Sequence, residues 1–198
     1  MFDSIRWGIL GPGRIAHQFA RGLEALPDAQ LVAVGSRARE RADAFGDAFG
    51  VPRRHGSYEA LAQDPEVDAI YVATPHPMHA EDSILCLRAG KAVLCEKPLT
   101  VNLKQAQRLV AVAREEGKFL MEAMWSRFLP TLLQVRRWLE DGVIGEPRMV
   151  YADFGFRADF DEDSRIFDLD LGGGALLDVG VYAVSFASMV YGAATLEI

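Results

Sequence analysis

Short apolar runs alternate with helix-forming stretches along the first 120 residues of the chain. The apolar runs cover residues 5–10, 31–37, 69–75, 92–95 and 119–121, and helical patterns cover 15–20, 58–62, 78–89 and 102–116. Gly90 and Gly117 follow two of these helices, and Asn102 is a suitable cap for the last one. Strands that alternate with helices of about a dozen residues predict βαβ units and a parallel sheet.

The pattern changes near residue 122. It predicts an amphipathic helix over 131–141, a turn over 145–147 and a strand over 148–154. We therefore place a domain boundary here, and we expect residues 122–198 to begin a second α/β (α+β) domain. The sequence contains neither an internal repeat nor a low-complexity segment.

The first apolar run leads directly into the pattern G-x-G-x-x-A at the start of a helix. Gly11 permits a tight turn, Gly13 lets the backbone approach a pyrophosphate, and the small Ala16 lets helix and strand pack closely. The backbone N–H groups that begin the helix, at Arg14 and Ile15, would face the phosphates. The motif alone is also compatible with a plain turn. In this context it predicts that residues 1–121 form a Rossmann-type doubly wound parallel sheet that binds NAD(P).

The second apolar run ends in basic residues. In a Rossmann unit this strand end meets the adenosine ribose, where an acid accepts from the 2′-hydroxyl of NAD and an arginine accommodates the 2′-phosphate of NADP. Here Ser36 and Arg37 stand in place of an acid, with Arg41 close behind. A guanidinium pairs with phosphate oxygens, so we expect NADP rather than NAD. Arg39 is interpreted as a solvated helix residue.

Composition narrows the class of protein. Of the 198 residues, 50% are hydrophobic, and the formal net charge is -7. An acidic chain of this kind is not expected to bind nucleic acid, which needs a basic face. Cys86 and Cys95 form no C-x-x-C motif and are expected to be buried thiols of a cytoplasmic protein. We identify no signal peptide and no apolar run of membrane-spanning length, and expect no membrane partner.

Glu96, Lys97 and Pro98 follow the strand at 92–95, at the sheet edge where doubly wound folds bind ligands. A lysine at a strand end can donate to a substrate hydroxyl or carbonyl oxygen. The simpler interpretation is a surface ion pair between Glu96 and Lys97.

Gly172, Gly173 and Gly174 lead into a predicted helix on which Asp178 and Tyr182, four residues apart, share a face. An acid and a phenol beside a lysine can form a proton-transfer group. Alternatively, Asp178 is a helix-start residue and Tyr182 a core aromatic residue.

Three other patterns are weaker. His76 and His79 lack a third ligand, so we predict no metal site, and His76 is better placed near the nicotinamide end of a cofactor. Asp159, Asp161 and Asp163 resemble a calcium loop but lack its required glycine and glutamate, so we expect a solvated loop. Trp125 and Phe154 are either core residues or walls of a substrate pocket.

Taken in order, these motifs resemble the glucose–fructose oxidoreductase and inositol dehydrogenase (Gfo/Idh/MocA) family. The resemblance rests on the G-x-G-x-x-A turn, Thr74-Pro75 with Met78-His79, Glu96-Lys97-Pro98, and the glycines before Asp178 and Tyr182. Tyr182 stands where most members carry histidine. With Glu122 to Phe128 and Arg165 to Asp168, it resembles the branch of dimeric dihydrodiol dehydrogenases and NADP-dependent D-xylose dehydrogenases.

The resemblance implies an NADP-dependent dehydrogenase for a hydroxyl or carbonyl group of a sugar, polyol or trans-dihydrodiol. Lys97, Asp178 and Tyr182 would be catalytic, and Trp125 and Phe154 would contact the substrate. The implied cofactor contacts are Gly11, Gly13, Arg14, Ile15, Ser36, Arg37, Arg41, Thr74, Pro75, His76, His79, Glu96 and Lys97. Family members are longer, so we expect an amino-terminal portion of an enzyme that is a homodimer at full length. A non-catalytic NADP-binding sensor or regulatory module is the alternative.

Overall fold

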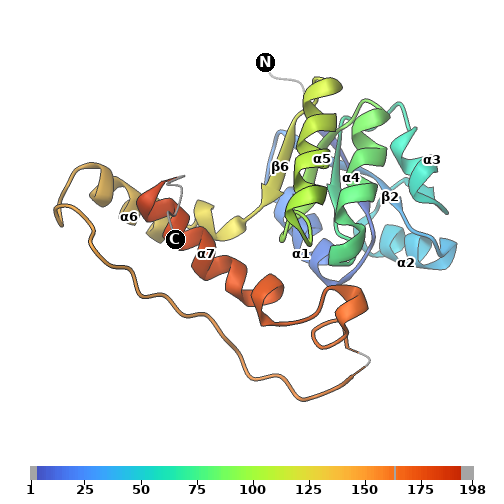
Figure 1. The fold of residues 1–198 in the computed structure, drawn as a ribbon. Coiled ribbons are helices and arrows are strands. Elements are labelled where there is room, and N and C mark those ends of the chain that lie inside the picture. The colour runs from blue at the N-terminus through green and yellow to red at the C-terminus, as the bar shows by residue number, and fades with distance from the viewer. Residues whose placement is uncertain (1–3, 163, 193–198) are drawn as a thin grey trace. The chain divides into compact units, whose positions relative to one another are not determined.

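The computed structural model describes residues 4–162 and 164–192. The chain divides into two compact units, Met1–Ala123 and Met124–Ile198 (Figure 1).

The first unit is built on a six-stranded sheet with the order β3-β2-β1-β4-β5-β6, in which all neighbouring strands are parallel. The strands are β1 (Ile5–Leu10), β2 (Ala29–Gly35), β3 (Arg53–His55), β4 (Ala69–Val72), β5 (Ala92–Glu96) and β6 (Leu120–Ala123). The order reverses between β1 and β4, which makes the crevice at their carboxyl ends the ligand site of a doubly wound fold. The predicted Rossmann-type sheet is confirmed.

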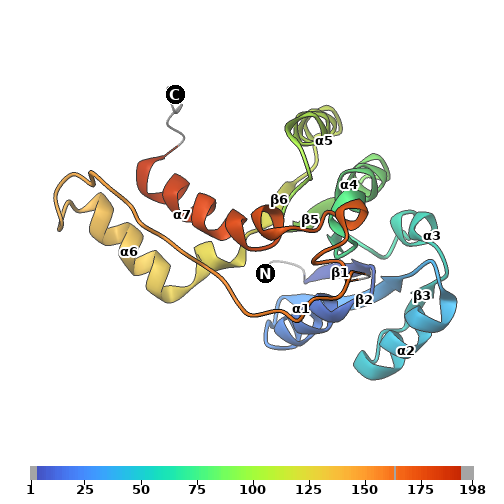
Figure 2. The ribbon, with the colours of Figure 1, turned by 60° about the horizontal axis from the view of Figure 1, so that its bottom comes forward.

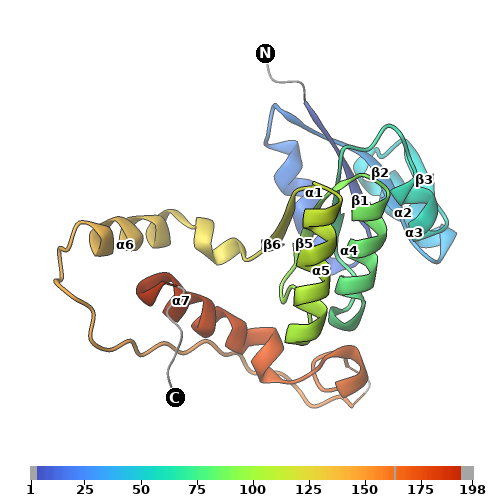
Figure 3. The same ribbon diagram turned by 45° about the horizontal axis from the view of Figure 1, so that its top comes forward.

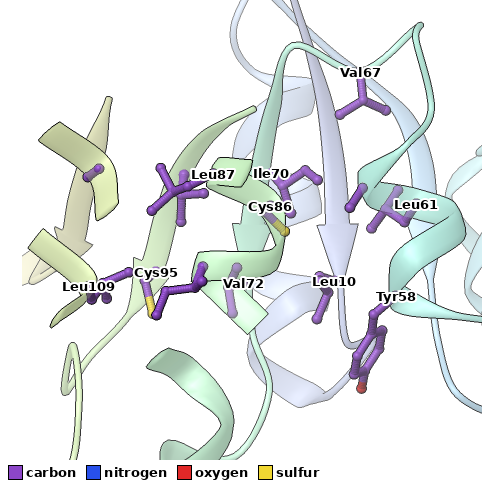
Figure 4. Packing of buried hydrophobic residues seen from close by; sticks show 14 of the residues in the cluster. Leu10, Tyr58, Leu61, Val67, Ile70, Val72, Cys86, Leu87, Cys95 and Leu109 are labelled. Carbon is purple, nitrogen blue, oxygen red and sulfur yellow. The ribbon is translucent and has the colours of Figure 1, made fainter. Parts of the chain in front are cut away.

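Helices cover both faces of this sheet (Figure 2). They are α1 (Arg14–Glu24), α2 (Arg39–Phe49), α3 (Tyr58–Ala62), α4 (His79–Arg88) and α5 (Leu103–Glu115), with a short 3-10 turn η1 (His76–Met78) before α4. The cluster around Leu61, Ile70, Leu87 and Leu109 joins α3, α4 and α5 to one face of the sheet (Figure 4). A second cluster joins α1 and α2 to the other face. Figure 3 shows α4 and α5 side by side.

Strand β3 carries no apolar pattern, and the sequence analysis missed it. It pairs with β2 at the edge of the sheet through Arg53, Arg54 and His55. The fully buried Asp64 carboxylate holds this polar strand, because it accepts from Arg53 Nε at 2.6 Å and lies 2.8 Å from His55 Nε2. Buried ion-pair contacts therefore stabilise this strand, and they leave no apolar periodicity in the sequence.

The described part of the second unit has helices at both ends and a long irregular segment between them. It contains η2 (Trp125–Phe128), α6 (Pro130–Glu140), η3 (Leu169–Leu171), a π-helical turn η4 (Leu176–Gly180) and α7 (Val181–Tyr191). The strand predicted over 148–154 is wrong. Met149 and Tyr151 are 86% and 88% exposed, and no described strand lies beside this segment to pair with its backbone. A strand needs such a neighbour.

One expectation about membrane-spanning runs also needs correction. Among the described residues, Leu169–Tyr191 is long and apolar enough to cross a bilayer, judged by length and composition alone. The stretch includes Asp170 and Asp178, and it contains the residues predicted to carry out proton transfer. Its polar contacts, described below, tie it to other parts of the same unit.

Candidate functional site

The glycine turn between β1 and α1 has the geometry of a phosphate cradle. Gly11 has a φ of 88°, and a Cβ there would lie 3.1 Å from Thr74 Cγ2 and 3.2 Å from the Ala73 carbonyl oxygen. Gly13 is the N-cap of α1 and provides no side chain, so the backbone N–H groups of Arg14 and Ile15 are not capped by a side chain. Uncapped donors at a helix N-terminus favour an anionic group such as a pyrophosphate.

The end of β2 gathers the predicted ribose-site residues. Ser36 is buried, and its Oγ accepts from the Ala38 N–H at 3.2 Å, which holds the turn into α2. Arg37 and Arg41 are exposed, and their charges act on the hydroxyl of the buried Tyr58. Burial raises the pKa of Tyr58, and the two arginines oppose that rise. The sequence analysis missed Tyr58, which is noted there only as a helix residue.

Thr74 and Asp82 place buried polar atoms beside the same region. Thr74 Oγ1 and Asp82 Oδ2 are both buried and make no hydrogen bond of ordinary geometry among the residues that the structure describes, although the two side chains lie close enough for Thr74 to lower the pKa of Asp82. Burial raises the pKa of the Asp82 carboxyl, while Thr74 and the Arg37 charge act to lower it. A cofactor hydroxyl or amino group would satisfy such atoms, because unpaired buried polar groups are costly.

His79 ties together the loops that follow β4 and β5. Its ring is fully buried, with Nδ1 2.7 Å from the Pro98 carbonyl oxygen and Nε2 2.8 Å from the Thr74 carbonyl oxygen. Burial lowers its pKa, although both carbonyls oppose that shift. Because both ring nitrogens face carbonyl oxygens, His79 fixes these loops and is badly placed to bind a metal. The described residues hold no cluster of metal-ligating side chains. Asp163, of the predicted acidic loop, lies outside the described residues.

Lys97 is positioned by a chain of aromatic and carboxyl contacts. Phe19 of α1 stacks on Tyr71 with ring centroids 3.9 Å apart, and the Tyr71 hydroxyl donates to Glu96 Oε1. Glu96 Oε2 in turn accepts from the Lys97 backbone N–H at 3.1 Å. Burial raises the pKa of Glu96, and its two donors oppose the rise. The carboxyl is therefore used to hold the backbone of Lys97, which precedes the cis peptide bond to Pro98.

The two cysteines are buried free thiols, as predicted. Burial raises the pKa of Cys95 to about 12 and also raises that of Cys86, so neither thiol is a nucleophile.

In the second unit the glycine-rich loop folds tightly onto itself. A Cβ at Gly173 would lie 2.6 Å from the Asp168 carbonyl oxygen, and the Gly173 and Gly174 N–H groups donate to Asp168 and Ile166 carbonyls at 2.8 Å. The loop places Arg165 so that Nη1 donates to Asp178 Oδ1 at 3.2 Å. Asp178 is buried on η4, immediately before α7.

Tyr182 lies on the first turn of α7 between two aromatic residues. Trp125 Nε1 donates to its hydroxyl oxygen at 2.9 Å, and the two rings meet edge to face at 5.9 Å. The Phe154 ring lies 4.8 Å from that of Tyr182. Trp125 and Phe154 are each 51% exposed, so neither is a core residue. The structure thus brings both predicted substrate-pocket residues to the predicted proton-transfer tyrosine.

The strand order, the glycine turn and the uncapped N-terminus of α1 define a dinucleotide-binding α/β protein. A family model described as "Oxidoreductase family, NAD-binding Rossmann fold" matches residues 5–124, and the GFO/IDH/MocA C-terminal domain matches residues 132–197. The chain belongs to the GFO/IDH/MocA oxidoreductase family.

Its similar relatives include trans-1,2-dihydrobenzene-1,2-diol dehydrogenases. The mouse protein is 48% identical over 192 residues, which cover 96% of this chain and 57% of the relative. The human protein is 44% identical, and the match covers 96% of this chain and 57% of the human protein. The chain thus spans a little over half the length of these relatives.

Two solved structures are also similar. KijD10, a 3-ketoreductase from Actinomadura kijaniata in complex with NADP and TDP-benzene, gives a TM-score of 0.80 at 39% identity, with 95% of this chain and 57% of KijD10 covered. Aldose-aldose oxidoreductase from Caulobacter crescentus, complexed with glycerol, gives a TM-score of 0.88 at 29% identity. The match covers 96% of this chain and 58% of that oxidoreductase.

Proposed function

We propose that the protein is an NADP-dependent dehydrogenase that transfers a hydride between nicotinamide and a secondary hydroxyl or carbonyl of a sugar, polyol or trans-dihydrodiol. The observation that carries this proposal is the presence of Lys97, Asp178 and Tyr182 in a member of this oxidoreductase family. Support also comes from the named activities of the dihydrodiol dehydrogenases and of KijD10. KijD10 has in addition been solved with one lysine or one tyrosine replaced.

The residues of the first unit fit the cofactor. The Gly11 turn and the N–H groups that begin α1 would bind the pyrophosphate, while Arg37 and Arg41 would bind the 2′-phosphate. Bound NADP supplies the hydride chemistry.

Proton transfer is assigned to the protein's own side chains. Tyr182 takes the hydroxyl proton during oxidation and returns it during reduction. As the family resemblance implies, Lys97 would donate a hydrogen bond to the same substrate oxygen, and its positive charge would favour the tyrosinate. Asp178, held by Arg165, would position Lys97 or a second substrate hydroxyl. Trp125 and Phe154 would wall the substrate.

Location and assembly also remain proposals. Two buried free thiols are compatible with the cytoplasm. We also propose a homodimer, which the family resemblance implies.

Replacement of Tyr182 by Phe tests the assignment. Tyr182→Phe keeps the ring and removes the hydroxyl, so turnover should fall by about 10²–10⁴-fold while NADP affinity changes little. Turnover is measured with D-xylose, D-glucose and a trans-dihydrodiol. Tyr151→Phe, at a tyrosine that is 88% exposed, is the matched control.

Near-normal turnover of Tyr182→Phe would move the search for the base to His76. If the unmodified protein binds NADP but turns over none of these substrates, the non-catalytic NADP-binding module is the better description.

A further inference from the structure

Side chains of the turn η2 form hydrogen bonds to α7 at two points that lie one helical turn apart. Trp125 donates from Nε1 to the Tyr182 hydroxyl oxygen at 2.9 Å. Arg127 donates from Nε to Ser185 Oγ at 2.8 Å and from Nη2 to the Ser185 carbonyl oxygen at 3.0 Å. Ser185 follows Tyr182 by three residues on the same helix. The Arg127 anchor therefore holds η2 in register with α7, and the indole N–H of Trp125 keeps a fixed direction.

The chemistry of indole determines the direction of this hydrogen bond. An indole nitrogen only donates, so the Tyr182 oxygen is the acceptor and its own proton must point elsewhere. A donor aimed at a phenol oxygen also favours the ionised form, because the phenolate accepts a stronger hydrogen bond than the neutral phenol. The edge-to-face contact at 5.9 Å, with Phe154 at 4.8 Å on Tyr182, limits rotation of the phenol ring.

We propose that Trp125 is a positioning residue for proton transfer, which orients the Tyr182 hydroxyl and stabilises its phenolate through the indole N–H. This inference rests on the proposed role of Tyr182 as the proton-transfer group. This role is separate from the proposed contact of Trp125 with the substrate. It depends on the indole N–H and not on the size of the ring.

Several charged groups lie on the segments around Tyr182. They are Arg127 on η2, Asp153 beside Phe154, Asp178 on η4 with its partner Arg165, and Arg136, Arg137 and Glu140 on α6, which also packs on α7. Lys97 is the cation of the proposed reaction. Replacement of Trp125 by Phe changes none of these charges and keeps an aromatic ring, so the change in Tyr182 ionisation reports the lost N–H.

The ionisation of Tyr182 can be measured without turnover. The tyrosinate absorbance of the full chain is titrated against pH, and subtraction of the Tyr182→Phe titration isolates this one tyrosine. Trp125→Phe should raise the midpoint by about one pH unit, which lowers the phenolate fraction about tenfold at pH values below the midpoint. Trp138→Phe is the matched control, because Trp138 is also half-exposed, at 50%, but lies on α6. Circular dichroism at each pH verifies that the variants are folded.

A midpoint that is unchanged or lower in Trp125→Phe would overturn the inference, as would an equal rise in Trp138→Phe. Failure of the proposed function looks different, because it appears as normal turnover in Tyr182→Phe, whatever the titration shows. If both proposals hold, the pH profile of turnover in Trp125→Phe moves to higher pH by the same amount as the absorbance midpoint.

Discussion

Arg37 occupies the position at the end of β2 where an NAD-preferring site carries an acid. Arg37 and Arg41 could be predicted as cofactor contacts from the sequence, because this strand end meets the ribose in a Rossmann unit. The sequence did not indicate Tyr58 or Asp82, whose positions near Arg37 depend on how α3 and α4 pack on the sheet. It also did not show that Ser36 Oγ holds its own turn.

Reversing the charge at Arg37 should reverse the cofactor preference. Arg37→Asp removes the proposed phosphate partner and offers an acceptor to a ribose hydroxyl. Loss of a charge-assisted pair costs about 1.5–3 kcal/mol, so NADP affinity should fall about tenfold or more. Titration with NADP and NAD measures this change. Arg39→Asp is the control, because it changes the net charge by the same amount. The Arg39 guanidinium pairs with Asp43 at 3.0 Å and is not proposed to bind the phosphate. Equal affinity of the unmodified protein for the two cofactors would remove the basis of this prediction.

At the scale of elements, the apolar strands of the sheet could be predicted from the sequence. The polar strand β3 was missed, and a strand was wrongly predicted over residues 148–154. The runs that became β1, β2, β4, β5 and β6 are apolar because helices cover both faces of the sheet. Strand β3 lacks this signal because Asp64 holds it by charge, and residues 148–154 show a strand pattern without a described neighbour to pair with. The glycine-rich loop was recognised by its residues, but its pairing of Arg165 with Asp178 was not foreseen.

The Asp64 contacts should stabilise the first unit in a pH-dependent way. Burial acts to raise the pKa of Asp64, but hydrogen bonds from Arg53, the Glu66 N–H and His55 outweigh it and hold the pKa at about 2, below the ordinary 3.8. The stabilisation is therefore complete above about pH 4 and is lost as the pH falls toward 2. At roughly 1.4 kcal/mol per pKa unit, the shift contributes about 2–3 kcal/mol.

Asp64→Asn should therefore lower the free energy of unfolding by about 2 kcal/mol at pH 7, and by less at pH 3, where the Asp64 carboxyl of the unfolded chain is already mostly protonated. Urea unfolding at the two pH values measures the difference. Asp43→Asn removes the exposed partner of Arg39 and should cost less than about 0.5 kcal/mol. A deficit that is the same at both pH values would show that packing, rather than charge, is responsible.

On the scale of the whole chain, the two units differ in how much apolar surface they bury. Nearly all buried apolar residues of the described ranges belong to Met1–Ala123, and Met124 is the exception. The described part of the second unit exposes large side chains such as Trp138, Ile144 and Phe160. The residues proposed to hold the cofactor phosphates all belong to the first unit.

Residues 1–123 expressed alone should therefore fold and bind NADP. The affinity should lie within about threefold of that of the whole chain, a difference of less than 1 kcal/mol. Titration of NADPH fluorescence measures the affinity, and circular dichroism verifies the fold. A folded fragment that does not bind NADP would show that the second unit contributes to the cofactor site.

The stack of Phe19 on Tyr71 connects the proposed nucleotide-binding helix to the proposed substrate side of the site. Phe19 belongs to the helix proposed to hold the pyrophosphate, and Tyr71 reaches the Lys97 backbone through Glu96. Coupling between two ligand sites is reciprocal: a factor by which one ligand changes the affinity for the other applies equally in reverse. We therefore expect that a substitution of Phe19 or Tyr71 that changes the nucleotide preference also changes the preference among alcohol substrates.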